Sequence, residues 1–115
     1  MLNVELTRFK VKEGMSKTVD EWLAFLNEHM AETLLTLEQE KMYVETIFRE
    51  TLDGVEYLYW YSVQGQDAPE VEESDHWIDK KHLEYWAACI DREFRPIDLK
   101  TEVVMIPTAI RDQIK

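Results

Sequence analysis

Cysteine, glycine and proline are all scarce in this sequence. Cys89 is the only cysteine among 115 residues, so no disulfide can form within the chain, which is typical of a reducing environment. No apolar run approaches the roughly 20 residues that a membrane-spanning helix needs. The first residues also lack the basic and apolar regions of a signal peptide. We therefore expect a cytoplasmic protein.

Several motifs of catalytic and cofactor sites are absent. With only three glycines, the chain has no glycine-rich phosphate loop and no Gly-x-Ser-x-Gly nucleophile motif. It has no His-x-x-x-His or Cys-x-x-Cys pair, and the spacing of His76 and His82 directs their side chains to different sides of a helix. We predict neither a metal site nor a bound cofactor.

Acidic residues far outnumber basic ones. The chain has 24 acidic and 13 basic residues, a net charge of −11, and no Lys or Arg between Arg49 and Lys80. A surface of this charge repels phosphate backbones and anionic lipids, so we expect neither nucleic acid nor a membrane as a partner. The simplest role of the acidity is to keep the protein soluble.

The rest of the composition is that of a folded domain. The chain is 45% hydrophobic and 32% charged, which argues against disorder. Its length is that of one ordinary domain, long enough to bury a core without disulfides or metal. We predict a single domain over residues 1–115.

The first half of the chain changes its hydrophobic period twice. Residues 4–11 alternate between polar and apolar and predict a strand. From Val19 to Leu37 apolar residues recur every three or four positions, which predicts one continuous helix capped by Ser16 or Thr18. Alternation then returns over residues 41–52 and predicts a second strand.

A turn, a third strand, a second helix and a last strand follow. Asp53-Gly54 is a strong signal for a two-residue hairpin turn, and alternation resumes over residues 57–63. Residues 65–73 have the composition of a solvated loop. Ser74 or Asp75 then begins a helix that runs to about Ile90. The run Val103–Ile106, stopped by Pro107, is the expected last strand.

This order of elements predicts an α+β fold of the ferredoxin-like βαββαβ type. Its four-stranded antiparallel sheet would carry two helices on one face. Alternation within the strands leaves aromatic and aliphatic residues on both faces of the sheet, which is more apolar surface than a monomer normally exposes. The tyrosine row, defined as Tyr57, Tyr59 and Tyr61, could either line a pocket or form the centre of an interface; we favour a homodimer interface.

The order of elements, with the opening pattern Arg8-Phe9-Lys10-Val11-Lys12-Glu13-Gly14, resembles the dimeric α/β-barrel superfamily. The run Glu56–Tyr61, together with His76–His82 and Tyr85-Trp86, is similar to a bacterial family with no assigned function. The resemblance implies a dimeric α/β barrel. It does not indicate a reaction, because the superfamily includes oxygenases, haem-degrading enzymes and proteins without known activity.

Two ionisable residues are candidates for catalysis. His82 lies on the helix face that carries Ile78 and Trp86, so it should face the sheet, where a histidine can act as a general base or be a buried structural residue. Glu45 shares a strand face with Arg49, and we expect its carboxylate to pair with that residue or with a histidine. Cys89, on the same helix stripe, is expected to belong to the core.

Two functions remain open on the sequence alone. The first is a dimeric protein that binds a small molecule between sheet and helices, with Trp86, Tyr59, Trp60 and Arg49 as candidate ligand-binding residues. The second is an enzyme of the cofactor-free monooxygenase type, in which His82 or Glu45 removes a proton from the substrate. A deep pocket that encloses a polar triad with His82 would favour the enzyme, whereas a core filled by Trp22, Trp60 and Trp86, with no cavity left, would favour the binding protein.

Overall fold

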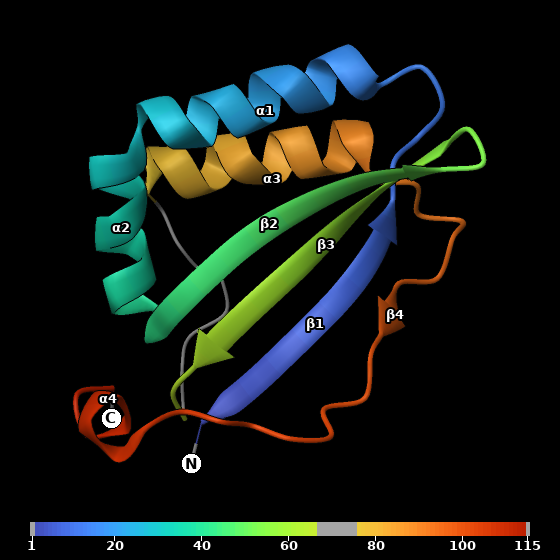
Figure 1. Cartoon of the computed structure of the whole chain (residues 1–115). Helices are drawn as coiled ribbons and strands as arrows, with labels where there is room; N and C mark the ends of the chain where they lie inside the picture. The colour runs from blue at the N-terminus through green and yellow to red at the C-terminus, as the bar shows by residue number, and fades with distance from the viewer. Residues whose placement is uncertain (1, 67–75, 115) are drawn as a thin grey trace.

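The computed structural model describes residues 2–66 and 76–114 of the chain. The elements follow in this order: β1 (Asn3–Lys10), α1 (Ser16–Glu28), α2 (Met30–Gln39), β2 (Met42–Leu52), β3 (Val55–Gln64), α3 (Trp77–Cys89), β4 (Ile97–Asp98) and α4 (Thr108–Arg111). The strands form one antiparallel sheet in the order β2-β3-β1-β4. Helices α1 and α3 lie alongside each other against this sheet (Figure 1). The expected ferredoxin-like α+β architecture is confirmed.

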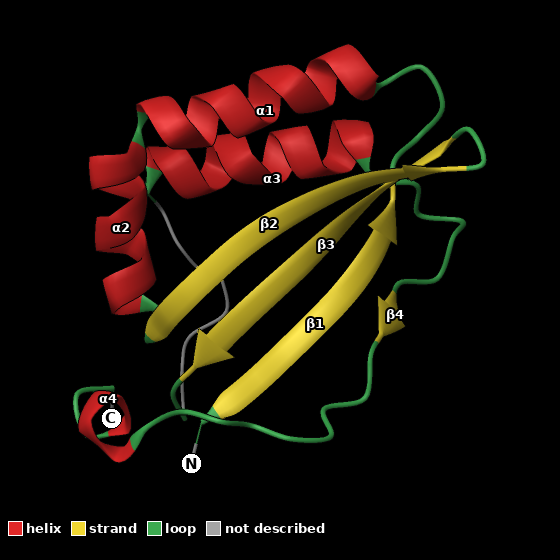
Figure 2. Cartoon of the chain, in the orientation of Figure 1, coloured by secondary structure: helices red, strands yellow, loops and turns green. Residues whose placement is uncertain are grey.

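The hairpin between β2 and β3 forms where the sequence predicts it (Figure 2). Asp53 and Gly54 both have positive φ, 51° and 78°. A two-residue turn whose central residues both have positive φ matches the twist of the strands that it joins, and Asp-Gly is one of the few pairs that adopt it readily. The turn fixes the pairing of β2 with β3 from Leu52 back to Val44.

The predicted single helix is wrong, because the chain breaks at His29 into α1 and α2. His29 has φ −107° and ψ 32°, and α2 then turns sharply away from α1 toward the start of β2 (Figure 1). The Thr33 hydroxyl donates to the His29 carbonyl at 2.9 Å, and the His29 ring packs on Phe25 at 4.8 Å. Apolar spacing continues across the bend, so the sequence pattern does not reveal it.

The expected caps of the first helix are also absent. Met15 precedes α1, and no side chain caps the helix. Ser16 lies within the first turn, where its hydroxyl accepts a hydrogen bond from Arg49 instead. The other expected caps, Ser74 and Asp75, and most of the expected loop at 65–73 lie outside the described residues. Helix α3 is capped by His76, whose Nδ1 accepts from the Ile78 N–H at 3.2 Å.

The last strand lies earlier than predicted. Ile97 and Asp98 pair with β1, whereas 103–106 belongs to no strand. Beyond β4 the chain still follows β1. The Leu99 N–H donates to the Leu6 carbonyl at 2.9 Å, and the Thr101 hydroxyl donates to the Val4 carbonyl at 2.7 Å. The apolar run itself remains in solvent, with Met105 86% exposed. Hydrophobicity is therefore a poor guide to which residues pair at this edge.

The core lies between the helices and one face of the sheet. Val19, Trp22, Leu58 and Cys89 are fully buried in it. Trp22 contacts the Trp60 ring, with 5.6 Å between ring centroids, so Leu58 and Trp60 are on the sheet face that meets the helices. By alternation, the tyrosine row lies on the opposite face. Burial raises the pKa of the Cys89 thiol, as befits a core cysteine.

Candidate ligand-binding site

A cavity of about 490 Å³ lies between the sheet and the helices, at the α2 end of the molecule. We call it the α/β cavity. Most of its apolar wall comes from the helices and β2, with Leu26, Met30, Leu34, Leu37 and Ile47. Four ionisable side chains, Glu40, Glu45, Asp79 and His82, line it together with Trp60. An apolar hollow with a few convergent polar groups is the usual form of a small-molecule site.

A bulge in β2 shapes the cavity wall. Met42 pairs with Gln64 but Val44 pairs with Val63, so Tyr43 is an extra residue on β2. Strict alternation would place Met42 and Glu45 on opposite faces, yet both line the cavity. The extra residue resolves this conflict, since a bulge shifts the alternation by one position.

The Glu45 carboxylate is held against the sheet. It accepts a hydrogen bond from the Trp60 indole N–H at 2.5 Å. Burial raises the pKa of Glu45, the indole bond opposes this effect, and the negative charge of Asp79 adds to it. The group is thus a carboxylate whose affinity for a proton is higher than usual.

His82 lies in the cavity wall as a neutral imidazole. Its Nδ1 accepts a hydrogen bond from the Trp22 indole N–H at 3.0 Å, so in the neutral form its proton is on Nε2. Burial lowers the pKa of His82 to about 4, although Asp79 works in the opposite direction. Glu45, which was expected to pair with Arg49 or a histidine, does not bond Nδ1. At neutral pH, His82 therefore offers a hydrogen-bond donor.

Asp79 was not anticipated as a site residue. It precedes His82 by one helical turn, lines the cavity and is only 5% exposed. Within the described part of the chain, no donor is bonded to its carboxylate. Its only signal in the sequence is its position three residues before His82, which places both side chains on the same helix face.

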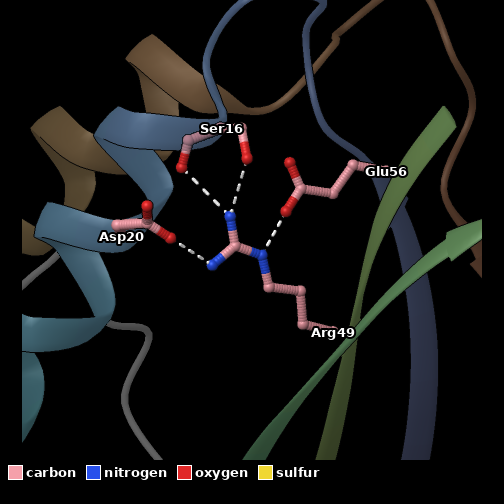
Figure 3. A network of polar contacts seen from close by, with 4 residues as sticks. All are labelled: Ser16, Asp20, Arg49 and Glu56. Carbon is pink, nitrogen blue, oxygen red and sulfur yellow. Dashed lines mark hydrogen bonds and ion pairs between the residues drawn. The ribbon is translucent and has the colours of Figure 1, made fainter. Parts of the chain in front are cut away.

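Arg49 lies away from the cavity, so the expected pair with Glu45 does not form. Its guanidinium binds Asp20 at 2.6 Å, the carbonyl and hydroxyl oxygens of Ser16 at 3.0 Å each, and Glu56 (Figure 3). These partners belong to the start of α1 and to β3. The network joins α1 to the hairpin, and Arg49 does not line the cavity.

Two further candidate ligand-binding residues also lie outside the cavity. Trp86 is in the aromatic cluster of the core, with ring centroids 4.5 Å from Phe9 and 5.1 Å from Trp60. Tyr59 is on the opposite face of the sheet, where its hydroxyl donates to Glu50 at 2.6 Å. Of the candidates from the sequence, the structure brings together Glu45, Trp60 and His82.

Comparisons with known proteins identify the family. The profile of a family of unknown function, DUF6176, matches residues 2–112. The chain belongs to this family. No curated protein is significantly similar in sequence. Among solved structures, the crystal structure of an L-rhamnose mutarotase from Formosa agariphila is similar, with a TM-score of 0.55 and 16% identity over 91% of this chain and 98% of that chain. At this identity the similarity shows the fold alone.

The described part of the chain contains neither a cluster of metal-binding side chains nor a membrane-spanning helix. Among residues 2–66 and 76–114, no three His, Cys, Asp or Glu side chains are grouped so that they could hold a metal ion. No helix in the same ranges is long and apolar enough to cross a membrane. The α/β cavity is therefore the feature on which we base a functional proposal.

Proposed function

We propose that the protein binds a small molecule in the α/β cavity. The observation that carries this proposal is the convergence of Glu45, Asp79 and His82 on a cavity of about 490 Å³ in which apolar residues make up more than half of the remaining wall. Such a volume is within the range of small-molecule sites. The ligand would lie over Trp60 and beneath α2.

The electrostatics of the cavity support a functional role. Desolvation shifts the pKa of Glu45 upward and that of His82 downward, so each group is held where its charged form is disfavoured. Perturbed ionisable groups are concentrated in functional sites. Two such groups facing one cavity favour a binding site.

A second candidate function is catalysis by proton transfer without a cofactor. Glu45 would be the general base, because burial raises the pKa of its carboxyl group. His82 would donate from Nε2–H to the negative charge that develops on the substrate. An L-rhamnose mutarotase of similar fold indicates that this architecture can serve an enzyme. Glu45→Gln would then abolish turnover of a bound ligand, whereas a pure binding protein would show no turnover to lose.

A homodimer is part of the proposal. The open sheet face carries the tyrosine row, and Phe48 on β2 is 55% exposed. A second copy packed on this face would cover it and complete a dimeric α/β barrel. A cytoplasmic location likewise remains a prediction from the single cysteine.

A ligand screen with cavity-filling variants tests the binding site. We expect metabolites from a library of neutral and charged small molecules to raise the melting temperature of the wild type, because a ligand that binds only the folded state stabilises it. Leu34→Trp should abolish these shifts, since Leu34 lines the cavity at its exposed rim and a larger side chain would fill it.

The matched control is Leu35→Trp. Leu35 is the next residue of α2 and similarly exposed, at 56% against 49%, but does not line the cavity. Its shifts should equal those of the wild type. Equal loss of binding in both variants, or retention in both, would contradict the proposed site.

A further inference from the structure

We infer that the ligand of the α/β cavity is an organic cation, an ammonium group on an apolar body. This inference rests on the proposed function and specifies the class of ligand. It follows from the charges of the cavity wall and from one buried carboxylate within it.

The charges of the wall are all of one sign. Glu40, Glu45 and Asp79 line the cavity, whereas no Lys or Arg of the described ranges does so. His82 cannot compensate, because it is neutral at neutral pH. An anionic ligand would meet only like charges here, where the low dielectric strengthens their repulsion. A cation would be attracted by the carboxylates of Glu45 and Asp79.

The Asp79 carboxylate points independently to a cation. It is 5% exposed and lines the cavity, yet no described residue donates to it. A buried carboxylate without a donor or counter-ion is costly. An ammonium group supplies three donors and a positive charge, and so satisfies Asp79 directly. A ligand hydroxyl would donate one hydrogen bond and leave the charge uncompensated.

The apolar residues of the cavity wall suit the hydrocarbon body of such a ligand. Trp60 lines the cavity and adds aromatic surface to its sheet side. Leu26, Met30 and Leu37 give the opposite wall an aliphatic surface that would cover a hydrocarbon body.

Three probes with one ring skeleton separate the ligand classes: cyclohexylmethylammonium, cyclohexylmethanol and cyclohexanecarboxylate. Calorimetric titration of the full chain at pH 7 and low salt should give the tightest binding for the ammonium probe. We expect an affinity at least about tenfold higher than for the alcohol, consistent with a charge-assisted hydrogen bond in a poorly solvated site. The carboxylate should not bind.

Asp79→Asn tests the role of the carboxylate. It should remove most of the preference for ammonium over alcohol while the alcohol affinity stays within about twofold, because only the charged ligand uses the carboxylate. Asp112→Asn removes the same charge from an exposed position near the C-terminus and should leave the preference unchanged. Circular dichroism verifies that both variants are folded.

Failure of the cation inference and failure of the proposed binding function give different results. If the alcohol or the carboxylate binds as tightly as the ammonium, or if Asp79→Asn keeps the preference, the cation inference is wrong and the cavity remains a ligand site. If no probe binds but the metabolite screen returns a ligand that Leu34→Trp blocks, the inference is wrong again. If the screen is also empty, the proposed function fails with it.

Discussion

At the scale of single residues, the hydrogen bond from Trp22 determines what His82 can do. Trp22 is fully buried, so its indole N–H has no access to solvent and needs an acceptor. Protonation of His82 at Nδ1 would replace that acceptor by a second donor. The bond and the burial thus act together to keep the imidazole neutral, with its proton on Nε2.

This arrangement predicts a loss of stability in acid. The pKa of His82 is about 4 in the folded protein, below its value of 6.5 in the unfolded chain. Between these values the unfolded state binds a proton that the folded state does not, so the free energy of unfolding falls as the pH drops from 6.5 to 4. The effect reaches on the order of 3 kcal/mol at most. Glu45 acts in the opposite direction, because its raised pKa adds stability that is present in acid and lost as the pH rises through the folded value.

Urea denaturation of the wild type and His82→Gln at about pH 7 and about pH 4.5 measures this effect. The glutamine side chain is not ionisable, so the variant should lose less stability on acidification than the wild type. The variant should be less stable than the wild type at neutral pH, by about 1–2 kcal/mol, because the Trp22 donor loses its aligned acceptor. Equal pH dependence of the two proteins would contradict a neutral buried His82.

The site was partly predictable from the sequence at this scale. The position of His82 on the apolar stripe of α3 indicates that it faces the sheet, and alternation in β3 places Trp60 beside it. The partner of His82, by contrast, lies sixty residues earlier in α1, and no spacing rule relates them. Asp79 was missed because an acidic residue in the first turn of a helix is ordinarily explained by the helix dipole.

At the scale of elements, the Arg49 network holds α1 to the β2–β3 hairpin. All three guanidinium nitrogens are used, and the partners differ in exposure: the Glu56 side chain is 13% exposed and that of Asp20 is 64%. A screened surface pair contributes little to stability, whereas a better shielded pair contributes more. The fork geometry of arginine is needed to reach two elements at once.

We therefore predict that Arg49→Met lowers the free energy of unfolding by about 1–2 kcal/mol and that Arg49→Lys recovers little of it. Asp20→Asn should cost less than about 0.5 kcal/mol because its carboxylate is largely solvated. Urea denaturation measures all three. A neutral Arg49→Lys variant, or an Asp20→Asn cost as large as that of Arg49→Met, would show that the network does not act as described.

The elements themselves show where sequence patterns succeed and fail. Asp53-Gly54 fixes the hairpin because its backbone conformation is a local property of those two residues. The break at His29 is a tertiary effect: apolar spacing is unchanged while α2 bends to the start of β2 and places Met30 and Leu34 over the cavity. Pairing at the β1 edge depends on backbone hydrogen bonds. Ile97 and Asp98 therefore pair with β1, and the more hydrophobic residues 103–106 do not.

At the scale of the whole molecule, one sheet face is covered by helices and the other is open. The fold is that expected from the order of elements, and the family assignment covers nearly all of the chain. A homodimer over the open face predicts twice the 13.8 kDa chain mass in light scattering at micromolar concentration. Tyr59→Glu should shift the mass toward the monomer, since it places charge in the centre of the interface. A monomeric wild type would contradict the dimer.

The central claim is that the α/β cavity binds a small molecule, and the tryptophan indole N–H signals test it most directly. The chain has four tryptophans, and the indole N–H groups of three of them have different hydrogen-bond partners. Trp60 donates to Glu45 and Trp22 to His82, whereas Trp77 donates to Glu32 away from the cavity. A ligand from the metabolite screen, added to ¹⁵N-labelled protein, should shift the Trp60 and Trp22 signals and leave that of Trp77 unchanged. Unchanged Trp60 and Trp22 signals at saturating ligand, or a shift of Trp77 alone, would contradict the claim.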